Sequence, residues 1–492
     1  MILKNNIALL SLLFMGLSVK AQTLEGYIRN FNTKEAIPYA TVQLGPDYGT
    51  IANEEGGFSL SLAGKAGDSL LISSMGYAQK RIPLPSAMEE IVIYLEPSAI
   101  ELDEVLLRDR QPSAEEIIRE VRRAYPQNYS STDQKYEVFY RGTSYMQFED
   151  LNVDIDKATR IPKQQVARAS KKLDSLARSV VESKLMEFRD YSGIVLLKQR
   201  DSSKISIDRA TRLLDSRKEF SMEGVQKQAQ GIILQYLDTS KTYKLKTGLF
   251  KIEDSLALDK EEFRQEKKTE YSRGEIRSSV MSTLKRSQWH ENSFLEKLLD
   301  PKAYEYTLDG ISYFQGNPIY VVSFFPGKGS SRFAGTFYIS TRDYAVLKAD
   351  YAFGDGKRGR KFNMKLLLGI KYIEKTHKGT VIYKAGANGI YHPYYITKEE
   401  GNYIYLHRPL KFIENSPRKD KVLFDFNLEG EGREKRELLI LKAEDLDPAE
   451  FINLTEAEKI PYTELKQFES SIWQDRQIIQ PLEEMKNFKA GD

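Results

Sequence analysis

A stretch of two-residue periodicity in the middle of the chain constrains the fold more than any other feature. Its residues are rich in β-branched and aromatic types and alternate between an apolar and a wetter set. This pattern is typical of half-buried strands. The turns between them are so short that neighbouring strands must be antiparallel. We therefore predict a β-meander, whose apolar face needs a cover of helices, a second sheet or a ligand, with strands at residues 319–325, 333–340 and 346–353.

The first 21 residues have the composition of a secretory signal peptide. Lys4 precedes a short apolar stretch at residues 7–17, and Val19-Lys20-Ala21 provides the cleavage positions. We place the mature start near Gln22, so the protein is expected to be exported, in the periplasm or associated with the outer membrane. The alternative is an uncleaved membrane anchor, which requires a longer apolar stretch. No second long apolar stretch follows, so we do not expect a helical membrane protein.

The mature chain is almost neutral and contains no cysteine. Removal of residues 1–21 takes away two lysines and no acid, so the formal net charge falls from +3 to +1. This balance argues against nucleic acid as a partner. The absence of cysteine excludes disulfides, thiolate metal sites, cysteine nucleophiles and acylation of an N-terminal cysteine. We expect no cofactor.

Residues 22–97 are predicted to form a small β-sandwich, because short apolar segments alternate there with turn residues at regular spacing. A polar linker at 98–112 follows. The length of 492 residues leaves room for a second, larger domain at 113–492. The strands expected in the first domain are 24–29, 40–44, 57–62, 69–73 and 91–95.

Four blocks of this N-terminal stretch occur in the order of a known domain: Leu24-Glu25-Gly26-Tyr27-Ile28, then residues 36–42, 49–60 and 68–77. Together they resemble the carboxypeptidase-regulatory-like domain of Bacteroidetes envelope proteins, a transthyretin-like β-sandwich. That domain is an accessory to carboxypeptidases and carries none of their catalytic residues, so the resemblance implies no peptidase activity. Residues 102–107 are similar to the segment that leads into the plug of TonB-dependent transporters. Too few residues follow for a plug and a large barrel, so we do not expect a transporter.

The second domain is predicted to be α+β, with a curved antiparallel sheet and covering helices. Ser113 and Glu116 form a capping box at the start of a helix that Pro126 is expected to end. This helix and the tail at 468–481 resemble a second Bacteroidetes domain of unknown function, and we expect the tail to close one end of its core. Further helices are predicted at 162–188, 231–237 and 292–299, and further strands at 136–145, 242–252, 278–284, 362–373, 380–383, 391–398, 403–406, 422–428 and 437–441.

A glycine-rich loop at 354–359 matches the dinucleotide-binding pattern in its spacing. That pattern requires a helix directly after the loop, and no capped helix follows. We predict a hairpin turn instead. Lys357, Arg358 and Arg360 make the loop basic, which leaves two interpretations open: a solvated turn, or contact with anionic glycan or lipid head groups.

None of the four histidines shows a metal-ligand spacing; they are His290, His377, His392 and His407. His392 and His407 lie in neighbouring predicted strands, so the fold could bring them together. We nevertheless predict no metal site and no catalytic residue. The acid pair Glu399-Glu400 means little alone, since a glycosidase needs two carboxylates at a distance that tertiary structure sets.

These features favour a non-catalytic cell-envelope protein that binds an amphiphile, a glycan or an envelope protein partner. Such a protein needs an apolar concavity, and we predict that its lining includes Phe324, Phe337, Tyr351 and Phe353. Two alternatives remain open: an accessory scaffold of a TonB-dependent uptake system, and a hydrolase that acts on glycan or peptide.

Three Asp-Ser-Leu triplets resemble the O-glycosylation signal of Bacteroidetes secreted proteins; they lie at 68–70, 174–176 and 254–256. Ser255 is the predicted acceptor, because Ser69 and Ser175 fall within elements that are expected to bury them.

Overall fold

The chain of this computed structural model divides into two compact units. The first comprises Met1–Ala99, Tyr313–Gly316 and Glu469–Glu483, and the second comprises Ile100–Ser312, Asn317–Phe468 and Glu484–Asp492. The predicted signal peptide and most of the predicted linker lie outside the described residues, so both stay predictions. The structure describes residues 23–45, 48–62, 67–84, 90–98, 111–129, 133–159, 161–183, 185–214, 231–232, 234, 237–238, 240–248, 250–258, 269–386 and 388–489.

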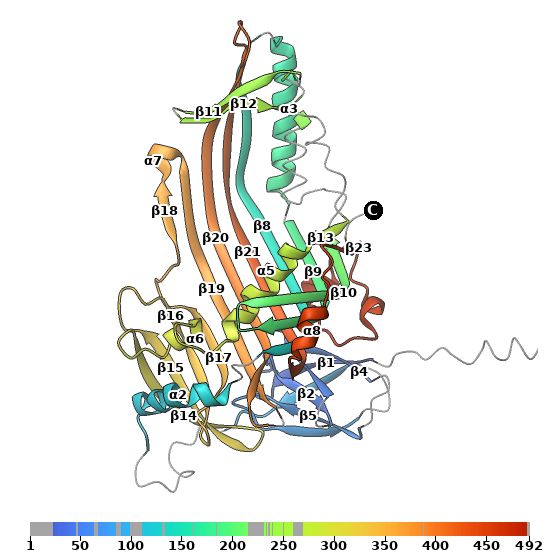
Figure 1. Cartoon of the computed structure of the whole chain (residues 1–492), viewed down its shortest axis with the longest axis vertical. Coiled ribbons are helices and arrows are strands. Elements are labelled where there is room, and N and C mark those ends of the chain that lie inside the picture. The colour runs from blue at the N-terminus through green and yellow to red at the C-terminus, as the bar shows by residue number, and fades with distance from the viewer. Residues whose placement is uncertain are drawn as a thin grey trace, which may run out of the picture. The chain divides into compact units, whose positions relative to one another are not determined.

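The first unit contains two small β-sheets whose side chains form one core (Figure 1). All five strands predicted from the sequence are present, and two short strands that the sequence did not reveal, β3 and β6, extend the second sheet. The buried core side chains come from both sheets and include Ile28, Val42, Phe58 and Leu70. One sheet has the order β4 (Gly57–Ser61), β1 (Thr23–Asn30), β7 (Ile91–Leu95), and the other has the order β3 (Tyr48–Ile51), β2 (Thr41–Leu44), β5 (Ser69–Ser73), β6 (Lys80–Pro83).

The segment Glu469–Glu483 belongs to the first unit, although the sequence suggested that it closes the core of the second domain. The buried side chain of Asn53 explains this placement. Its amide nitrogen donates to the backbone carbonyls of Gln480 (3.0 Å) and Pro481 (3.2 Å). Its amide oxygen accepts from the backbone N–H groups of Glu55 and Gly57, both at 2.9 Å. One asparagine therefore fixes both its own turn and the returning chain.

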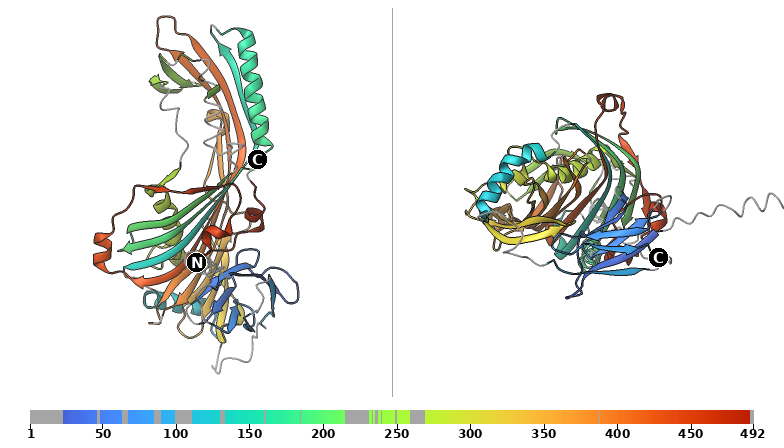
Figure 2. Two further views of the ribbon diagram at one scale, coloured as in Figure 1. Left: turned by 90° about the vertical axis from the view of Figure 1, so that its right-hand side faces the viewer. Right: turned by 90° about the horizontal axis from the view of Figure 1, so that it is seen from below.

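The second unit is organised by a single 14-stranded sheet, in which three long strands run side by side (Figures 1 and 2). These are β8 (Gln134–Ala158), β20 (Tyr391–Glu414) and β21 (Lys421–Asp445). The sheet order is β14-β15-β16-β17-β19-β20-β21-β8-β9-β10-β23, with β11, β12 and β18 off this path. The remaining strands are β9 (Leu185–Lys198), β10 (Ser202–Leu214), β11 (Thr242–Thr247), β12 (Phe250–Ala257), β14 (Tyr304–Phe314), β15 (Asn317–Pro326), β16 (Phe333–Ser340), β17 (Val346–Phe353), β18 (Lys361–Met364), β19 (Ile370–Ala385) and β23 (Thr463–Leu465), with β13 (Glu270–Ser272) and β22 (Lys459–Pro461) forming a separate pair.

The predicted meander is confirmed as β15, β16 and β17, which are consecutive antiparallel neighbours. The loop after β17 is a turn, with Gly356 at a φ of 68°. It does not make a hairpin, however. Strand β18, which follows the loop, pairs with β19, and β17 pairs with β19 as well. The predicted hairpin was therefore wrong, because β19 is long enough to accept two partners along one edge.

The helices agree with the sequence in part. The capping box at Ser113 and Glu116 is confirmed, although helix α2 continues past Pro126. The stretch predicted as a strand at 278–284 is helical, because a second capping box at Ser272 and Glu275 starts α5 there. Helix α3 ends before residue 185, where β9 begins. The helices are α2 (Ala114–Asn128), α3 (Lys163–Val181), α5 (Arg273–Leu284), α6 (Phe294–Lys297), α7 (Lys365–Leu368), α8 (Pro448–Asn453) and α9 (Glu483–Lys486), with short 3-10 turns at Lys285–Ser287 and Ser470–Trp473.

One face of the large sheet, which we call the inner face, carries both α3 and α5. Helix α3 buries Ala169 and Leu173 against Val153 and Phe424 of the long strands, and Val180 against Phe148. Helix α5 reaches the same face through Ser282, whose hydroxyl accepts a hydrogen bond from Arg436 at 2.8 Å. None of the described helices is both long and apolar enough to cross a membrane.

We expect Asn53→Ala to lower the free energy of unfolding by about 2–3 kcal/mol, because it leaves several buried backbone groups without partners. Hydrogen exchange in Glu469–Glu483 should accelerate at the same time. The matched control is Asn32→Ala, in an exposed turn. Unchanged exchange in the returning segment would show that Asn53 does not hold it.

Candidate binding cavity

A cavity of about 670 Å³ lies in the second unit, against the inner face of β19, β20, β21 and β8. Residues of the α5–α6 region, of β16 and β17, and of the loops that precede β16 and β18 complete its wall. Its lining combines charge with aromatic and apolar surface. The charged members and histidine are Arg286, Arg332, Arg360, Arg433, Glu374, Glu400, Glu434 and His377, and the apolar and aromatic members are Tyr145, Met146, Phe294, Phe333, Phe353, Tyr372 and Ile404.

A β-bulge places Glu374 and His377 on the same face of β19. Residues three apart in a regular strand point to opposite faces. In β19 the pairing with β20 shifts between Glu374 and Thr376, so the extra residue turns His377 back to the inner face. There its ring meets Glu400, its partner on β20. The bulge thus creates a cluster of two carboxylates and one imidazole.

These groups begin a polar belt that crosses the inner face. The His377 Nδ1 atom lies 3.1 Å from Glu374 Oε1 and 3.8 Å from Glu400 Oε1. The Lys398 Nζ atom lies 2.7 Å from Glu400 Oε2. On the next strand the Arg436 guanidinium lies 2.7 Å from the Glu434 carboxylate. Buried charges require such partners, and here each carboxylate of the belt has one.

Burial and the charges around the cavity together shift the pKa values of its groups. Burial lowers the pKa of His377 below 6.5, and the positive charge of Arg286 adds to the effect. Burial also lowers the pKa of Lys398, against its hydrogen bond to Glu400. For Glu400 burial alone would raise the pKa, but the hydrogen bond from Lys398 and its positive charge outweigh burial and lower it. At neutral pH the histidine is therefore uncharged.

The ligand-type atoms of Glu374, His377 and Glu400 lie within 4.8 Å of one another, a spacing that could hold a metal ion. The sequence predicted no metal site because the bulge and the cross-strand partner are invisible in it. The surroundings oppose a cation, since Lys398 occupies one side of Glu400 and Arg286 adds positive charge nearby.

An aromatic group surrounds the other side of the His377 ring. The ring centroid lies 5.2 Å from that of Phe333, 5.6 Å from that of Phe353 and 6.4 Å from that of Phe294. The Nε2 atom is buried and has no hydrogen-bond partner among the described residues. Its neighbourhood is thus apolar, which agrees with the lowered pKa.

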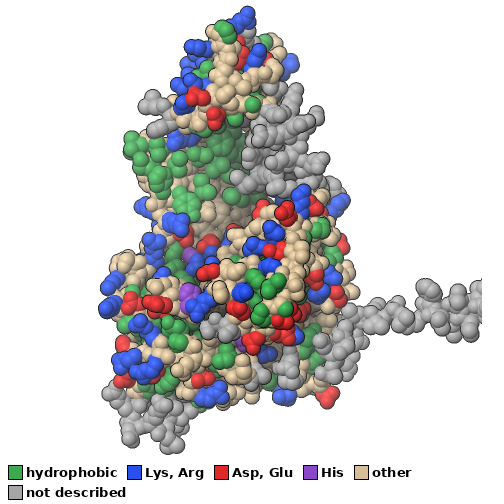
Figure 3. All heavy atoms as spheres, viewed as in Figure 1, with side chains coloured by type: hydrophobic (Ala, Val, Ile, Leu, Met, Phe, Trp, Pro, Cys, Tyr) green, Lys and Arg blue, Asp and Glu red, His purple; other side chains and the backbone are tan. Residues whose placement is uncertain are grey.

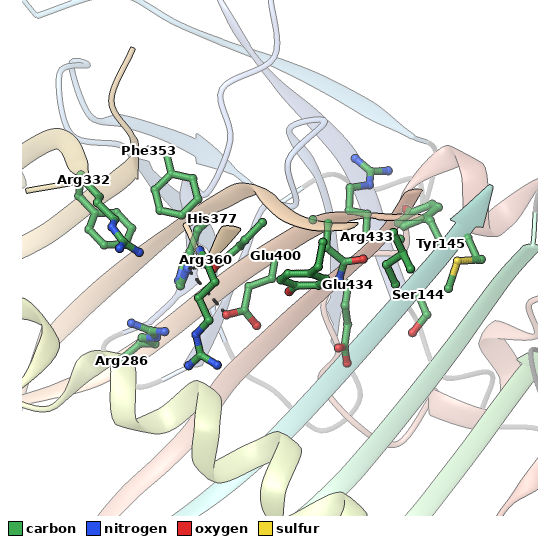
Figure 4. A pocket seen from close by; sticks show the side chains of 18 of the residues that line it. Ser144, Tyr145, Arg286, Arg332, Phe353, Arg360, His377, Glu400, Arg433 and Glu434 are labelled. Atoms are coloured by element: carbon green, nitrogen blue, oxygen red, sulfur yellow. Dashed lines mark hydrogen bonds and ion pairs between the residues drawn. The ribbon is translucent and has the colours of Figure 1, made fainter. Parts of the chain in front are cut away.

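Three guanidinium groups at the cavity have no carboxylate partner. Across the described parts of the chain, Arg286, Arg332 and Arg360 form no ion pair, and Figure 4 places all three on the His377 side of the cavity. Arg286 lies over the ring of Phe294, 4.4 Å from its centroid.

Arg360 is positioned by the turn that precedes it. The backbone N–H of Arg360 donates to Glu374 Oε2 at 3.0 Å. A Cβ atom on Gly359 would lie 2.1 Å from the same oxygen. A larger residue at 359 would therefore have to push the Glu374 carboxylate away from the backbone of Arg360.

The inner face becomes apolar directly above the cavity. By strand register, Ile370 is paired with Leu406, Leu406 with Leu428, and Leu428 with Leu151. All four side chains are only partly buried. Figure 3 shows hydrophobic side chains gathered over the upper parts of β18 to β21. The cavity therefore joins a charged end to an apolar surface on the same strands.

The structure brings together part of the lining predicted from the sequence. Phe353 and Arg360 line the cavity, and Tyr351 is buried in the aromatic group beside it. Phe324 and Phe337 do not line it. Both are fully buried, with ring centroids 4.7 Å apart, and they fill the core beneath the meander.

The other predicted residues lie away from the cavity. Lys357 and the exposed Arg358 belong to the turn before it. His392 and His407 are not brought together, because both lie on the single strand β20; His407 pairs with Asp425 at 3.0 Å. Ser255 is exposed on β12, and its glycosylation stays a prediction.

Sequence reasoning missed Glu374, Arg286 and Arg332, and it gave no role to His377 and Glu400, which it had considered. No local signal marks them, because they meet only through the bulge and through pairing of strands distant in sequence.

The fold and cavity define a β-rich protein with a charged and apolar internal site. Residues 24–107 match the CarboxypepD_reg-like domain family, so the domain predicted at the N-terminus is confirmed. No curated protein matches the chain.

Two solved structures show weak similarity. One is a DUF1329 family protein from Desulfovibrio piger, with 10% identity over 64% of this chain and 92% of that chain and a TM-score of 0.20. The other is the outer membrane protein OprG from Pseudomonas aeruginosa, with 6% identity over 65% of this chain and 99% of that chain and a TM-score of 0.14. At such TM-scores neither similarity carries an argument about fold or function.

We expect the stability of the protein to fall as the pH drops below 6.5, because buried neutral His377 resists protonation more than it does in the unfolded chain. This contribution is complete above 6.5 and is lost as the pH falls through the folded pKa. His377→Gln should reduce the acid-side loss of stability, because the variant has no imidazole to protonate. Urea titrations across this range measure it, and His407→Gln, with its half-exposed ring, is the control. Equal acid sensitivity of the wild type and His377→Gln would contradict the assignment.

Proposed function

We propose that the cavity binds an amphiphile with an anionic head group, and that the protein is an exported, non-catalytic component of the cell envelope. The observation that carries this proposal is the proximity, around one cavity, of three guanidinium groups that form no ion pair with the described residues and an apolar row on the inner face of the sheet. Export is supported by the signal-like stretch at 1–21, and an envelope role by the N-terminal domain.

The charged end of the cavity suits an anion. Two of its three glutamates, Glu400 and Glu434, are already paired with Lys398 and Arg436. The guanidinium groups of Arg286, Arg332 and Arg360 are left to act on a ligand. Guanidinium groups bind carboxylates and phosphates through two parallel hydrogen bonds. His377 is neutral and adds no charge of its own.

The apolar end suits an acyl chain. The partly buried row Ile370, Leu406, Leu428 and Leu151 crosses the inner faces of four neighbouring strands. At about 4.8 Å between neighbouring strands this row is about 14 Å long. One acyl chain spans half of a hydrocarbon core of about 30 Å, or roughly 15 Å. The row is therefore about as long as one extended chain whose head group lies among the arginines.

The hydrolase alternative has weaker support. Glu374 orients His377 in the manner of a catalytic dyad. However, the free Nε2 atom is buried against aromatic rings, and no described hydroxyl group donates to it. The scaffold alternative is supported by the N-terminal domain. Among the described residues of that unit, the exposed large apolar side chains are Phe31 and Val92.

We expect Arg332→Ala and Arg360→Ala each to weaken binding of a fluorescent long-chain fatty acid by about 10- to 100-fold, since each removes hydrogen bonds to a charged group. Binding of the methyl ester of the same acid should change little, because it retains the chain and lacks the charge. Titration of the purified protein with both probes measures the preference for the acid.

Arg123→Ala is the control. The side chain of this arginine on α2 is 72% exposed, pairs with Glu120 and does not line the cavity. The proposal fails if the wild type binds neither probe. It also fails if both cavity variants retain the preference for the acid. Native mass spectrometry of the protein from its own envelope would then identify any ligand that it carries.

A further inference from the structure

The short helix α7 displays two leucines to solvent. Leu366 is 101% exposed and Leu367 is 77% exposed, and Phe362 on the preceding strand β18 is 45% exposed. Large apolar side chains so close together and so exposed are unusual on a soluble surface. We call residues 361–371 the hairpin tip, which Figure 1 shows at the far end of β18 and β19.

The hairpin tip has a defined conformation. Strand β18 pairs with β19 from Lys361 to Met364 on one side and from Ile373 to Ile370 on the other. Gly369 ends α7 with a φ of 61°, and a Cβ atom there would lie 2.0 Å from the His407 carbonyl oxygen. The Gly369 carbonyl in turn accepts a hydrogen bond from the His407 N–H at 2.8 Å. The leucines are therefore presented by a fixed turn that is anchored on β20.

The flanks of the hairpin tip are basic. Lys361, Lys365 and Lys371 surround the leucines, and residues 357–373 contain no aspartate or glutamate. The Lys365 Nζ atom lies 3.8 Å from the ring centroid of Tyr405 on the neighbouring strand. Lysine and tyrosine are the side chains that occur at the boundary between head groups and acyl chains.

We propose that the hairpin tip docks the protein onto an anionic phospholipid membrane, with Leu366 and Leu367 inserted among the acyl chains and the three lysines against the head groups. Charge complementarity favours a membrane, because an anionic lipid surface attracts the three lysines. A protein partner fits less well, because the exposed large apolar side chains among the described residues of the tip are only Phe362, Leu366 and Leu367, whereas stable protein interfaces bury roughly 1,200–2,000 Å². The proposal concerns a site distinct from the cavity and does not depend on what the cavity binds.

Sedimentation of the purified protein with vesicles tests the docking. We expect binding to vesicles that contain phosphatidylglycerol and phosphatidylcholine, and weaker binding to phosphatidylcholine alone. The double variant Leu366→Ser/Leu367→Ser should lower the partition coefficient by about tenfold or more. The control is Ile452→Ser, which changes another exposed apolar side chain, 71% exposed on α8, and should bind like the wild type.

A second variant tests the role of the three lysines. Lys361→Gln/Lys365→Gln/Lys371→Gln should remove the preference for anionic vesicles and most of the salt dependence of binding. Binding of the fatty-acid probe should be unaffected in both sets of variants, which separates failure of this inference from failure of the proposed cavity function. Unchanged thermal unfolding would confirm that these exposed substitutions leave the fold intact.

Leu366→Trp reports insertion directly. The native Trp289 and Trp473 are buried and provide a constant background. Addition of anionic vesicles should shift the emission of the new tryptophan to shorter wavelength. The proposal would be overturned if the wild type did not bind vesicles, or if the wild type and the double-leucine variant bound them equally. So would an emission that shifts only when a protein from the envelope is added.

Discussion

The second unit depends on the long pairing of β20 with β21, which has no register shift, and of β21 with β8, which continues through three bulges. These ladders satisfy the backbone hydrogen bonds along three long strands. The strands can therefore carry charged side chains across their middle without breaking. The apolar row Ile370, Leu406, Leu428 and Leu151 crosses β19 and these three strands, whereas Arg286, Arg332 and Arg360 come from a 3-10 turn and two loops that border the same cavity.

The local sequence pattern was sufficient to predict strands where buried and exposed residues alternate, as in the meander from β15 to β17. It was insufficient in β20 and β21, where the sequence predicted separate short strands. The polar residues from Lys398 to Asn402 look like a loop, but their partners lie on neighbouring strands far away in sequence. The helix α5 was mistaken for a strand even though its capping residues, Ser272 and Glu275, were present.

The cavity was still harder to predict, because its geometry contradicts simple periodicity. Glu374 and His377 share a face only through the bulge in β19. Phe324 and Phe337 had the right residue type for a lining, but the meander uses them to fill its own core. Phe353 and Arg360 reach the cavity because they flank the turn where the sheet opens. Such distinctions arise from three-dimensional packing, which residue type and spacing do not encode.

Because Glu469–Glu483 belongs to the first unit, this unit cannot be completed until late in synthesis. The residues that complete this unit are made last, after the entire large sheet. The N-terminal domain therefore emerges from the ribosome, and from any export channel, with Asn53 still lacking two of its partners. The first unit therefore reaches its full set of contacts only after residues 469–483 have been made, and a chain that ends before them lacks part of its N-terminal domain.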